Sequence, residues 1–205
     1  MNFNDLPLMA QAAVGALIAY LIGSLSFAVI VSRVLGLNDP RTYGSGNPGA
    51  TNVLRSGNKA AAILTLVFDA LKGFVPVWWC VQTGWAPEAV AAVGLGAFVG
   101  HLWPVFFKFE GGKGVATAAG VLLGINAAMG GLVLLVWLGM AAAFRYSSLA
   151  ALSASLAAPV IQAWMMGPGV LTIAVAIMSA LLIWRHAPNI RKLLAGQESK
   201  IGQKA

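Results

Sequence analysis

The sequence contains long stretches without any charged residue, and these constrain the fold more than any other feature. Residues 115–144 and 146–184 carry no Asp, Glu, Lys or Arg, and neither do residues 6–32. The stretches 60–82 and 89–107 are almost as apolar. About 20 apolar residues in a helix cross the hydrocarbon core of a bilayer. The pattern predicts an all-α integral membrane protein with several transmembrane helices.

The composition agrees with this prediction. Of 205 residues, 59% are apolar and 9% are charged, whereas soluble domains carry about 25% charged residues. The length suits a single domain, residues 1–205. The basic residues behind the net charge of +7 lie between apolar runs, which favours a membrane surface or an anionic substrate over nucleic acid. The single cysteine, Cys80, excludes an intramolecular disulfide and a cysteine-based zinc cluster.

The number of spans follows from the distribution of positive charge. Residues 146–184 divide naturally at 167–169, Gly-Pro-Gly, but residues 115–144 could form one span or two, with a break within 124–131. If they form two, the protein has seven spans, and every basic residue except Lys72 falls on one face: Arg33, Arg41, Arg55, Lys59, Lys108, Lys113, Arg145, Arg185, Arg191, Lys192, Lys200 and Lys204. With six spans this asymmetry is lost. Because basic residues mark cytoplasmic loops, we expect seven helices, the N-terminus outside and the C-terminus in the cytoplasm. Residues 197–205 are expected to form a short flexible tail.

The first loop on the basic face is rich in glycine and asparagine. Residues 44–52 read Gly-Ser-Gly-Asn-Pro-Gly-Ala-Thr-Asn, and Arg55 follows. Such a backbone can turn several N–H groups inward and bind an anion. Ser45, Thr51 and Asn52 add polar donors, and Arg55 can bind a phosphate through two nitrogens. The alternative is an ordinary turn with a charged residue at the membrane interface.

The second loop contains Gly111, Gly112, Lys113 and Gly114 directly before an apolar helix. Backbone donors, a helix N-terminus and an ammonium group therefore converge, as they do in phosphate-binding loops. The spacing is not that of a Walker A motif, because glycine follows the lysine. Nucleotide hydrolysis is accordingly not predicted.

Two histidines and one charged pair complete the unusual polar residues. His101 lies near a helix end and could be a catalyst or a structural hydrogen-bond donor, and His186 lies after the last apolar stretch. Asp69 and Lys72 lie inside the second span at a spacing of three, so they can pair with each other. Charges at that depth are costly, and a structural ion pair is the favoured interpretation.

In this order, the clusters resemble the acyl-phosphate-dependent glycerol-3-phosphate acyltransferase family of bacteria, the PlsY family. The matching residues are 44–52, Asp69 with Lys72 and Gly73, residues 100–101 with 111–117, and His186 through Asn189 to Gly196 and Glu198. The resemblance covers nearly the whole chain. It implies transfer of a fatty acyl group from acyl phosphate to the primary hydroxyl of glycerol 3-phosphate, giving lysophosphatidic acid and phosphate without a cofactor or metal. It further implies a bacterial inner-membrane protein whose active site faces the cytoplasm, with the enzyme that makes acyl phosphate as a candidate partner.

The resemblance also assigns residues. In this family, the residues matching Arg55 and Lys113 hold substrate phosphate, those matching Ser45, Ser148, His186 and Asn189 line the same pocket, and the second loop is thought to receive the donor's phosphate. On this basis Ser45, Lys113, His186 and Asn189 are expected to be catalytic. The expected substrate-binding residues are Gly46, Asn47, Thr51, Asn52, Arg55, His101, Gly111, Gly112, Gly114, Thr117 and Ser148.

The chemistry of the residues fits this reaction. An acyl phosphate is already activated, so no covalent nucleophile is needed, and the site has to orient two anions and remove one proton. That proton could pass to His186 or to a phosphate oxygen of the substrate. The main alternative is a small-solute or lipid transporter, which would place its polar residues near the middle of the membrane.

Overall fold

The computed structural model describes residues 6–202 and is entirely helical in regular structure over this range, as predicted. Two short 3-10 turns accompany the α-helices, η2 (Leu54–Ser56) and η3 (Val105–Phe107). The helices are α1 (Leu8–Gly23), α2 (Phe27–Val34), α3 (Ala50–Val53), α4 (Lys59–Gln82), α5 (Pro87–Leu102), α6 (Val115–Ile125), α7 (Ala127–Phe144), α8 (Ser147–Met166), α9 (Val170–Arg185) and α10 (Ala187–Leu194).

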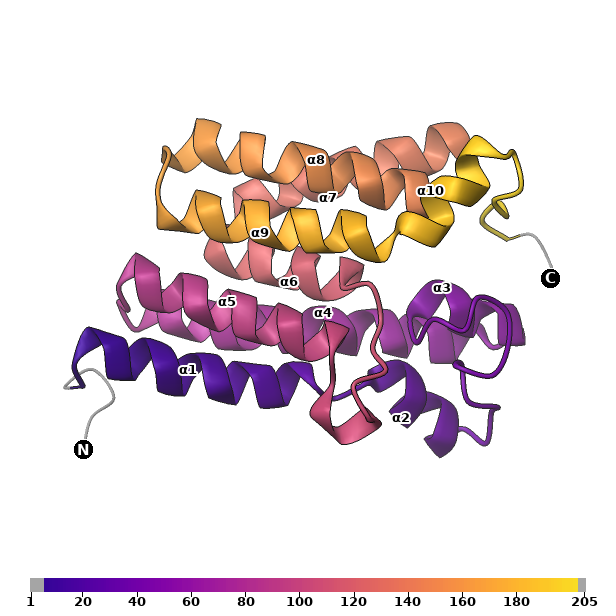
Figure 1. Ribbon diagram of the computed structural model, residues 1–205, viewed down its shortest axis with the longest axis horizontal. Coiled ribbons are helices and arrows are strands. Elements are labelled where there is room, and N and C mark those ends of the chain that lie inside the picture. Colours follow the sequence, from indigo (N-terminus) through magenta and orange to yellow (C-terminus); the bar gives the residue numbers. More distant parts are fainter. Residues whose placement is uncertain (1–5, 203–205) are drawn as a thin grey trace.

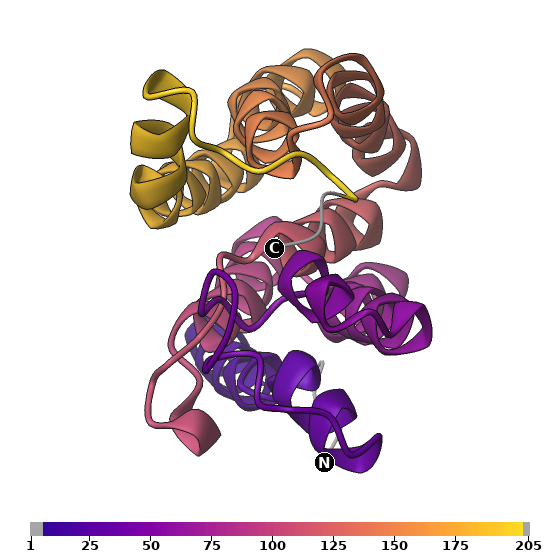
Figure 2. The ribbon, with the colours of Figure 1, turned by 90° about the vertical axis from the view of Figure 1, so that its right-hand side faces the viewer.

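The long helices form a bundle of two halves (Figures 1 and 2). In one half α1 packs along α5 and α4 packs along α6, and in the other α7 packs on α8 and α8 on α9. The contacts of α5 with α9 and of α6 with α7 join the halves. Phe98, Leu102 and Met129 are fully buried where these helices meet.

Small residues allow the helix backbones to approach closely. A Cβ atom at Gly100 would overlap the backbone of α1 at Tyr20, and one at Gly120 would overlap the backbone of α4 at Ala70. Helices in lipid gain little from burying apolar side chains against each other, so close packing of small residues supplies much of their association. These two glycines therefore explain why α1 packs on α5 and α4 packs on α6.

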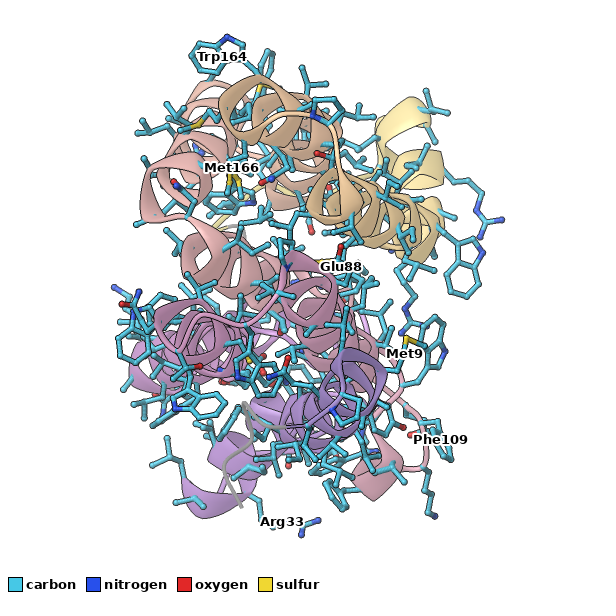
Figure 3. The ribbon with its side chains drawn as sticks, turned by 90° about the vertical axis from the view of Figure 1, so that its left-hand side faces the viewer. Met9, Arg33, Glu88, Phe109, Trp164 and Met166 are labelled. Atoms are coloured by element: carbon cyan, nitrogen blue, oxygen red, sulfur yellow. The ribbon has the colours of Figure 1, made fainter. Side chains whose placement is uncertain are left out.

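Large apolar side chains cover the outside of the bundle instead of its interior. Trp164 is 78% exposed and Met9 is 81% exposed, and Figure 3 shows Trp164 directed away from the other helices. A soluble protein does not leave so many large apolar groups in water. The outer surface of this protein suits lipid.

Five helical segments in the described range are long and apolar enough to cross a membrane, and a sixth is added if α9 and α10, which meet at a bend of 57°, count as one span. The predicted breaks are confirmed: Asn126 separates α6 from α7, and residues 167–169 separate α8 from α9. The first apolar stretch differs from the expectation of an unbroken segment, because residues 24–26 interrupt it between α1 and α2. With 11 residues, α6 is only about 16 Å long.

The interruption between α1 and α2 lies beside the charged pair of α4 and gives Lys72 a second partner. The buried Nζ of Lys72 lies 2.7 Å from Oδ1 of Asp69, so the predicted pairing is confirmed. The same ammonium donates a hydrogen bond of 2.7 Å to the carbonyl of Leu25, which the helix break leaves without a helical partner. Lys72 therefore compensates for the break in addition to pairing with Asp69.

The polar loops gather at one end of the bundle, on the right in Figure 1. Arg41 of the first loop binds Glu110 of the second, with 3.2 Å between Nη1 and Oε2. Arg55 donates a hydrogen bond of 2.6 Å to Ser199 in the tail. Glu88 lies at the opposite end, because α5 begins at Pro87 and ends in the second loop.

Candidate active site

The first loop is shaped by the side chain of Asn52. Its Oδ1 accepts a hydrogen bond from the backbone N–H of Ser45 at 3.0 Å, and its Nδ2 donates to the carbonyls of Pro40 and Tyr43 at 2.6 and 3.2 Å. Both amide hydrogens of this buried residue are therefore used within the loop. Asn52 fixes the turn that presents Ser45.

The second loop is held from two sides. The backbone N–H of Gly112 donates to the carbonyl of His101 at 3.2 Å. From the other side, Arg185 donates to the carbonyls of Gly111 and Gly112 at 2.7 and 3.1 Å. A Cβ atom at Gly111 would overlap the carbonyls of His101 and Leu102. The loop thus needs glycine to pass so close to the end of α5.

The Gly114 residue starts α6, as predicted. It is the N-cap of α6 and has a φ of +87°, a left-handed conformation that glycine adopts without strain. A side chain there would also overlap the ring of Phe98. The turn places Lys113 directly before the helix.

Residue Lys113 reaches across the bundle to the last helices. Its Nζ donates a hydrogen bond to Oδ1 of Asn189 in α10. Burial is the main reason that the pKa of Lys113 is lowered to about 8; the carboxylate of Glu198 opposes this shift, whereas the positive charges of Arg185, Lys192 and Arg55 add to it. The ammonium therefore stands in a strongly cationic surrounding.

The carboxylate of Glu198 connects three elements. Its Oε1 accepts hydrogen bonds from Oγ of Ser148 at 2.6 Å and from Nδ2 of Asn189 at 2.8 Å. Through the first contact Ser148, which is buried in α8, is joined to the tail. The contacts of Glu198 also place residues 197–202 of the expected tail against the site, while residues 203–205 lie outside the described part. The flexibility of the tail stays a prediction.

A pocket of about 200 Å³ lies between the first loop, α10 and the tail. Three of the predicted residues line it, Ser45, Arg55 and Asn189, together with Gly44, Lys192, Gln197, Glu198 and Ser199. Its size suits a small polar molecule, and its two cationic side chains favour an anion.

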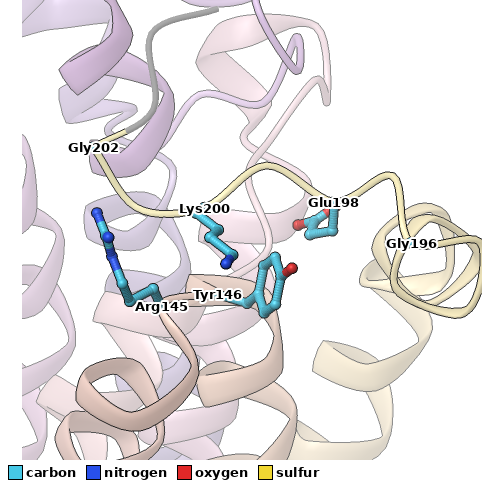
Figure 4. Close-up of a pocket in the computed structure, with 6 residues that line it drawn as sticks. All are labelled: Arg145, Tyr146, Gly196, Glu198, Lys200 and Gly202. Atoms are coloured by element: carbon cyan, nitrogen blue, oxygen red, sulfur yellow. The ribbon is translucent and has the colours of Figure 1, made fainter.

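A wider pocket of about 450 Å³ adjoins it and shares Glu198 (Figure 4). The tail forms one wall and the turn between α7 and α8 forms the other. The lining residues are Arg145, Tyr146, Gly196, Glu198, Lys200 and Gly202. The amino group of Lys200 lies 5.9 Å from the centre of the Tyr146 ring.

Several predicted residues support the site from a distance. His101 is buried in α5 with Nδ1 at 3.7 Å from Asp69 Oδ1, and Thr117 is buried in α6, where its hydroxyl donates to the carbonyl of Asp69 at 3.0 Å. His186 is buried between α9 and α10, with Nδ1 at 2.8 Å from the carbonyl of Leu182. None of these three is among the residues that line the 200 Å³ pocket.

The remaining members of the first loop lie at the surface near the pocket. Thr51 in α3 is exposed, and Asn47 is partly exposed. Gly46 has a φ of +67° and donates its N–H to the carbonyl of Tyr43 at 3.0 Å. They contribute to the shape of the loop but do not line the pocket itself.

Two residues at the centre of these contacts, Arg185 and Glu198, were not predicted to be site residues. Arg185 was counted only as a basic residue on one face, although it holds the second loop. Glu198 was quoted for the resemblance but was given no role. It is one of only two acidic residues after residue 88, and a lone carboxylate among basic residues is the signal that could have singled it out.

The fold and site define a helical membrane protein with a pocket at one end of its bundle, lined by the cationic side chains of Arg55 and Lys192. A sequence model of the family "Glycerol-3-phosphate acyltransferase" matches residues 13–196. The glycerol-3-phosphate acyltransferase of Paraburkholderia phytofirmans is 59% identical, over 95% of this chain and 92% of its own. That of Burkholderia cenocepacia strain HI2424 is 61% identical over the same shares. The chain belongs to the glycerol-3-phosphate acyltransferase family.

Solved structures agree with this assignment. The crystal structure of PlsY, an integral membrane glycerol 3-phosphate acyltransferase, in its glycerol 3-phosphate form is 38% identical, with a TM-score of 0.89 over 94% of this chain and 96% of that one. The lysophosphatidic acid form is 37% identical, with a TM-score of 0.87 over the same shares. The fold of this chain is therefore the PlsY fold, and the family resemblance is confirmed.

Proposed function

We propose that this protein transfers a fatty acyl group from an acyl phosphate to the primary hydroxyl of glycerol 3-phosphate. The observation that carries the proposal is the pocket, in which Arg55 from the first loop meets Asn189, the hydrogen-bond partner of Lys113 in the second loop. Lys113 is not itself a lining residue, but its contact with Asn189 brings it next to the pocket that Arg55 lines. Family membership and the likeness to PlsY with glycerol 3-phosphate support the choice of acceptor.

The reaction requires one bond to form and one to break. The hydroxyl oxygen of glycerol 3-phosphate attacks the carbonyl carbon of the acyl phosphate, and the bond from that carbon to the phosphate oxygen breaks. Phosphate leaves with the bonding electron pair, and the hydroxyl loses its proton. Arg55 and Lys113 neutralise the two phosphate groups, which keeps the reactants together and stabilises the departing charge.

The position of His186 favours a phosphate oxygen of the substrate over this ring as the acceptor of the proton. A carbonyl oxygen only accepts, so Nδ1 of His186 carries the hydrogen that it shares with Leu182, and Nε2 is the ring nitrogen left to accept a proton. The ring is buried and does not line the pocket. We assign His186 to the junction of α9 and α10, where it positions Asn189, instead of to proton transfer.

We also propose seven membrane-spanning segments, with the N-terminus outside and the site facing the cytoplasm of a bacterial inner membrane. The segments would be α1 with α2, α4, α5, α6, α7, α8 and α9. Helix α6 is too short to cross alone, but the residues directly before it, Gly111, Gly112 and Gly114, are also buried in the bundle and lengthen the segment. The basic residues of both loops and Lys200 of the tail lie at the site end, as the positive-inside rule requires.

Cysteine labelling tests this topology. The native Cys80 is buried, so single cysteines at Ser56 and Glu88 can be compared directly. A membrane-impermeant maleimide added to intact cells should label Glu88→Cys alone and label Ser56→Cys only after lysis. The reverse pattern would overturn the orientation.

The activity is tested with the purified protein in lipid vesicles, supplied with palmitoyl phosphate and labelled glycerol 3-phosphate. The proposal predicts lysophosphatidic acid and inorganic phosphate in equal amounts, without added metal, and a rate lower by about 100-fold or more with Lys113→Ala. Uptake of label into the vesicles without product would instead favour the transporter. We also propose the enzyme that makes acyl phosphate as a partner.

A further inference from the structure

Residue Arg185 has an unusual position for a basic residue at a membrane boundary. It is the last residue of α9 and is partly buried, yet it forms no ion pair with a carboxylate within residues 6–202. Arg41, by contrast, binds both Asp39 and Glu110. The guanidinium of Arg185 donates to two successive backbone carbonyls, those of Gly111 and Gly112, instead.

These two hydrogen bonds determine the orientation of two successive peptide groups in the second loop. Because a trans peptide is planar, its C=O and N–H point in opposite directions. The peptide between Gly111 and Gly112 is therefore held at both ends, by Arg185 on its carbonyl and by the carbonyl of His101 on its N–H. In the next peptide, the bond from Arg185 to Gly112 directs the N–H of Lys113 to the opposite side.

The end of α9 thus holds the loop at two points. Arg185 binds its backbone, and Asn189 in the following helix binds the side chain of Lys113. The loop belongs to one half of the bundle and α9 to the other. Both contacts therefore act between the halves, and one of their members, Asn189, also lines the pocket.

We propose that Arg185 is a positioning residue for the acyl transfer: it fixes the carbonyls of Gly111 and Gly112 so that Lys113 presents its ammonium to a substrate phosphate. Its unpaired charge also strengthens the attraction of the loop for that anion. This inference rests on the proposed function, because it assigns Arg185 to the phosphate of one of the two substrates. A charge that served only as a membrane anchor would need neither hydrogen bond.

The experiment compares Arg185→Ala and Arg185→Lys with wild type, and uses Arg191→Ala as the control because Arg191 is exposed on the neighbouring helix. Steady-state kinetics are measured for each substrate separately, and thermal unfolding is followed on the same samples. Loss of two hydrogen bonds from a charged donor should raise the KM for the substrate at the second loop by about tenfold or more in Arg185→Ala. The KM for the other substrate should change by less than about twofold, because the residues that bind that substrate are not altered by the substitution.

The conservative variant separates positioning from stability. Arg185→Lys keeps the charge and can satisfy one carbonyl, so it should recover part of the lost kcat/KM, and Arg191→Ala should behave as wild type. The alkaline limb of kcat/KM should move to higher pH in Arg185→Ala, because a positive charge near Lys113 is removed. Loss of the charge alone produces this shift, so positioning is recognised by the KM change confined to one substrate and by its partial recovery in Arg185→Lys.

The inference is overturned if Arg185→Ala keeps both wild-type KM values, or if its activity falls only in proportion to the folded protein. Either result with an active wild type would leave the proposed function intact. A wild-type protein that forms no lysophosphatidic acid would remove the proposed function instead.

Discussion

The amide oxygen of Asn189 accepts a hydrogen bond from the ammonium of Lys113, although 76 residues separate them. This contact joins the glycine loop before α6 to the short helix after α9. Asn189 also donates to Glu198 at 2.8 Å, and Glu198 binds Ser148. One chain of hydrogen bonds therefore connects the second loop, α8, α10 and the tail around the pocket.

Lys113 and Arg55 should be essential for activity. Lys113→Ala and Arg55→Ala should each lower kcat/KM by about 100-fold or more, since each removes a charge-assisted contact to phosphate. Lys113→Arg should fail as well, because a planar guanidinium does not replace a compact ammonium in a tight glycine loop. Initial rates in vesicles measure this.

The matched control for these variants is Lys59→Ala, which removes an exposed lysine at the start of α4. It should retain wild-type rates and unfold at the same temperature. Full activity of Lys113→Ala would contradict the assignment of the second loop.

The dependence on pH should report Lys113. Its pKa is lowered to about 8, mainly by burial, and only the protonated form attracts phosphate. The value of kcat/KM should therefore fall as pH rises through about 8, and kcat should fall at higher pH because bound phosphate favours the ammonium.

Removing the charge of Glu198 tests whether Lys113 causes this fall of kcat/KM. The carboxylate raises the pKa of Lys113, so Glu198→Gln, which can still accept hydrogen bonds from Ser148 and Asn189, should move the fall to lower pH. If the fall stays at the same pH, a group other than Lys113 causes it.

Two substitutions at His186 distinguish positioning from proton transfer. The amide of asparagine can replace the Nδ1–H donor that reaches the carbonyl of Leu182, but it cannot act as a base. His186→Asn should therefore retain at least about ten times the activity of His186→Ala, within the range expected for a lost hydrogen bond to a buried acceptor. Equal loss in both variants would restore His186 as the general base.

The buried pair in α4 should affect stability. Lys72→Met leaves Asp69 without its ion-pair partner and removes the donor to Leu25. Removing one member of a buried pair costs about 3–5 kcal/mol, so the unfolding temperature in detergent should fall markedly. The double variant Asp69→Leu with Lys72→Met should recover part of that loss, and a double variant less stable than Lys72→Met would contradict the account.

Much of the helical order followed from local sequence. The Gly-Pro-Gly sequence at 167–169 ends α8, and glycine at position 114 starts α6, because these residues act within one or two turns of their own position. The pairing of Asp69 with Lys72 followed from helix geometry in the same way. The interruption at residues 24–26 follows Gly23 and contains Ser24 and Ser26, but the apolar run continues on both sides of it. The carbonyl of Leu25 is satisfied by Lys72 from α4, a contact that local sequence does not predict.

The site was predictable in its parts but not in its connections. The residue types of the two glycine-rich loops, with Lys113 and Arg55, are enough to predict an anion site. The roles of Arg185 and Glu198 depend on which segments meet in space, since Arg185 binds residues 73 and 74 positions away and Glu198 binds Ser148, 50 positions away. Thr117 likewise binds Asp69, 48 positions away, whereas the hydrogen bonds of Asn52 stay within the first loop; neither residue lines the pocket.

The identity of the acyl donor is the most direct test of the account. Labelled glycerol 3-phosphate would be offered to the purified protein in lipid with palmitoyl phosphate, palmitoyl-CoA or palmitoyl carrier protein, each without added metal. We expect lysophosphatidic acid from palmitoyl phosphate alone. Product from either thioester, at a rate equal to or above that from the acyl phosphate, would contradict the proposed reaction.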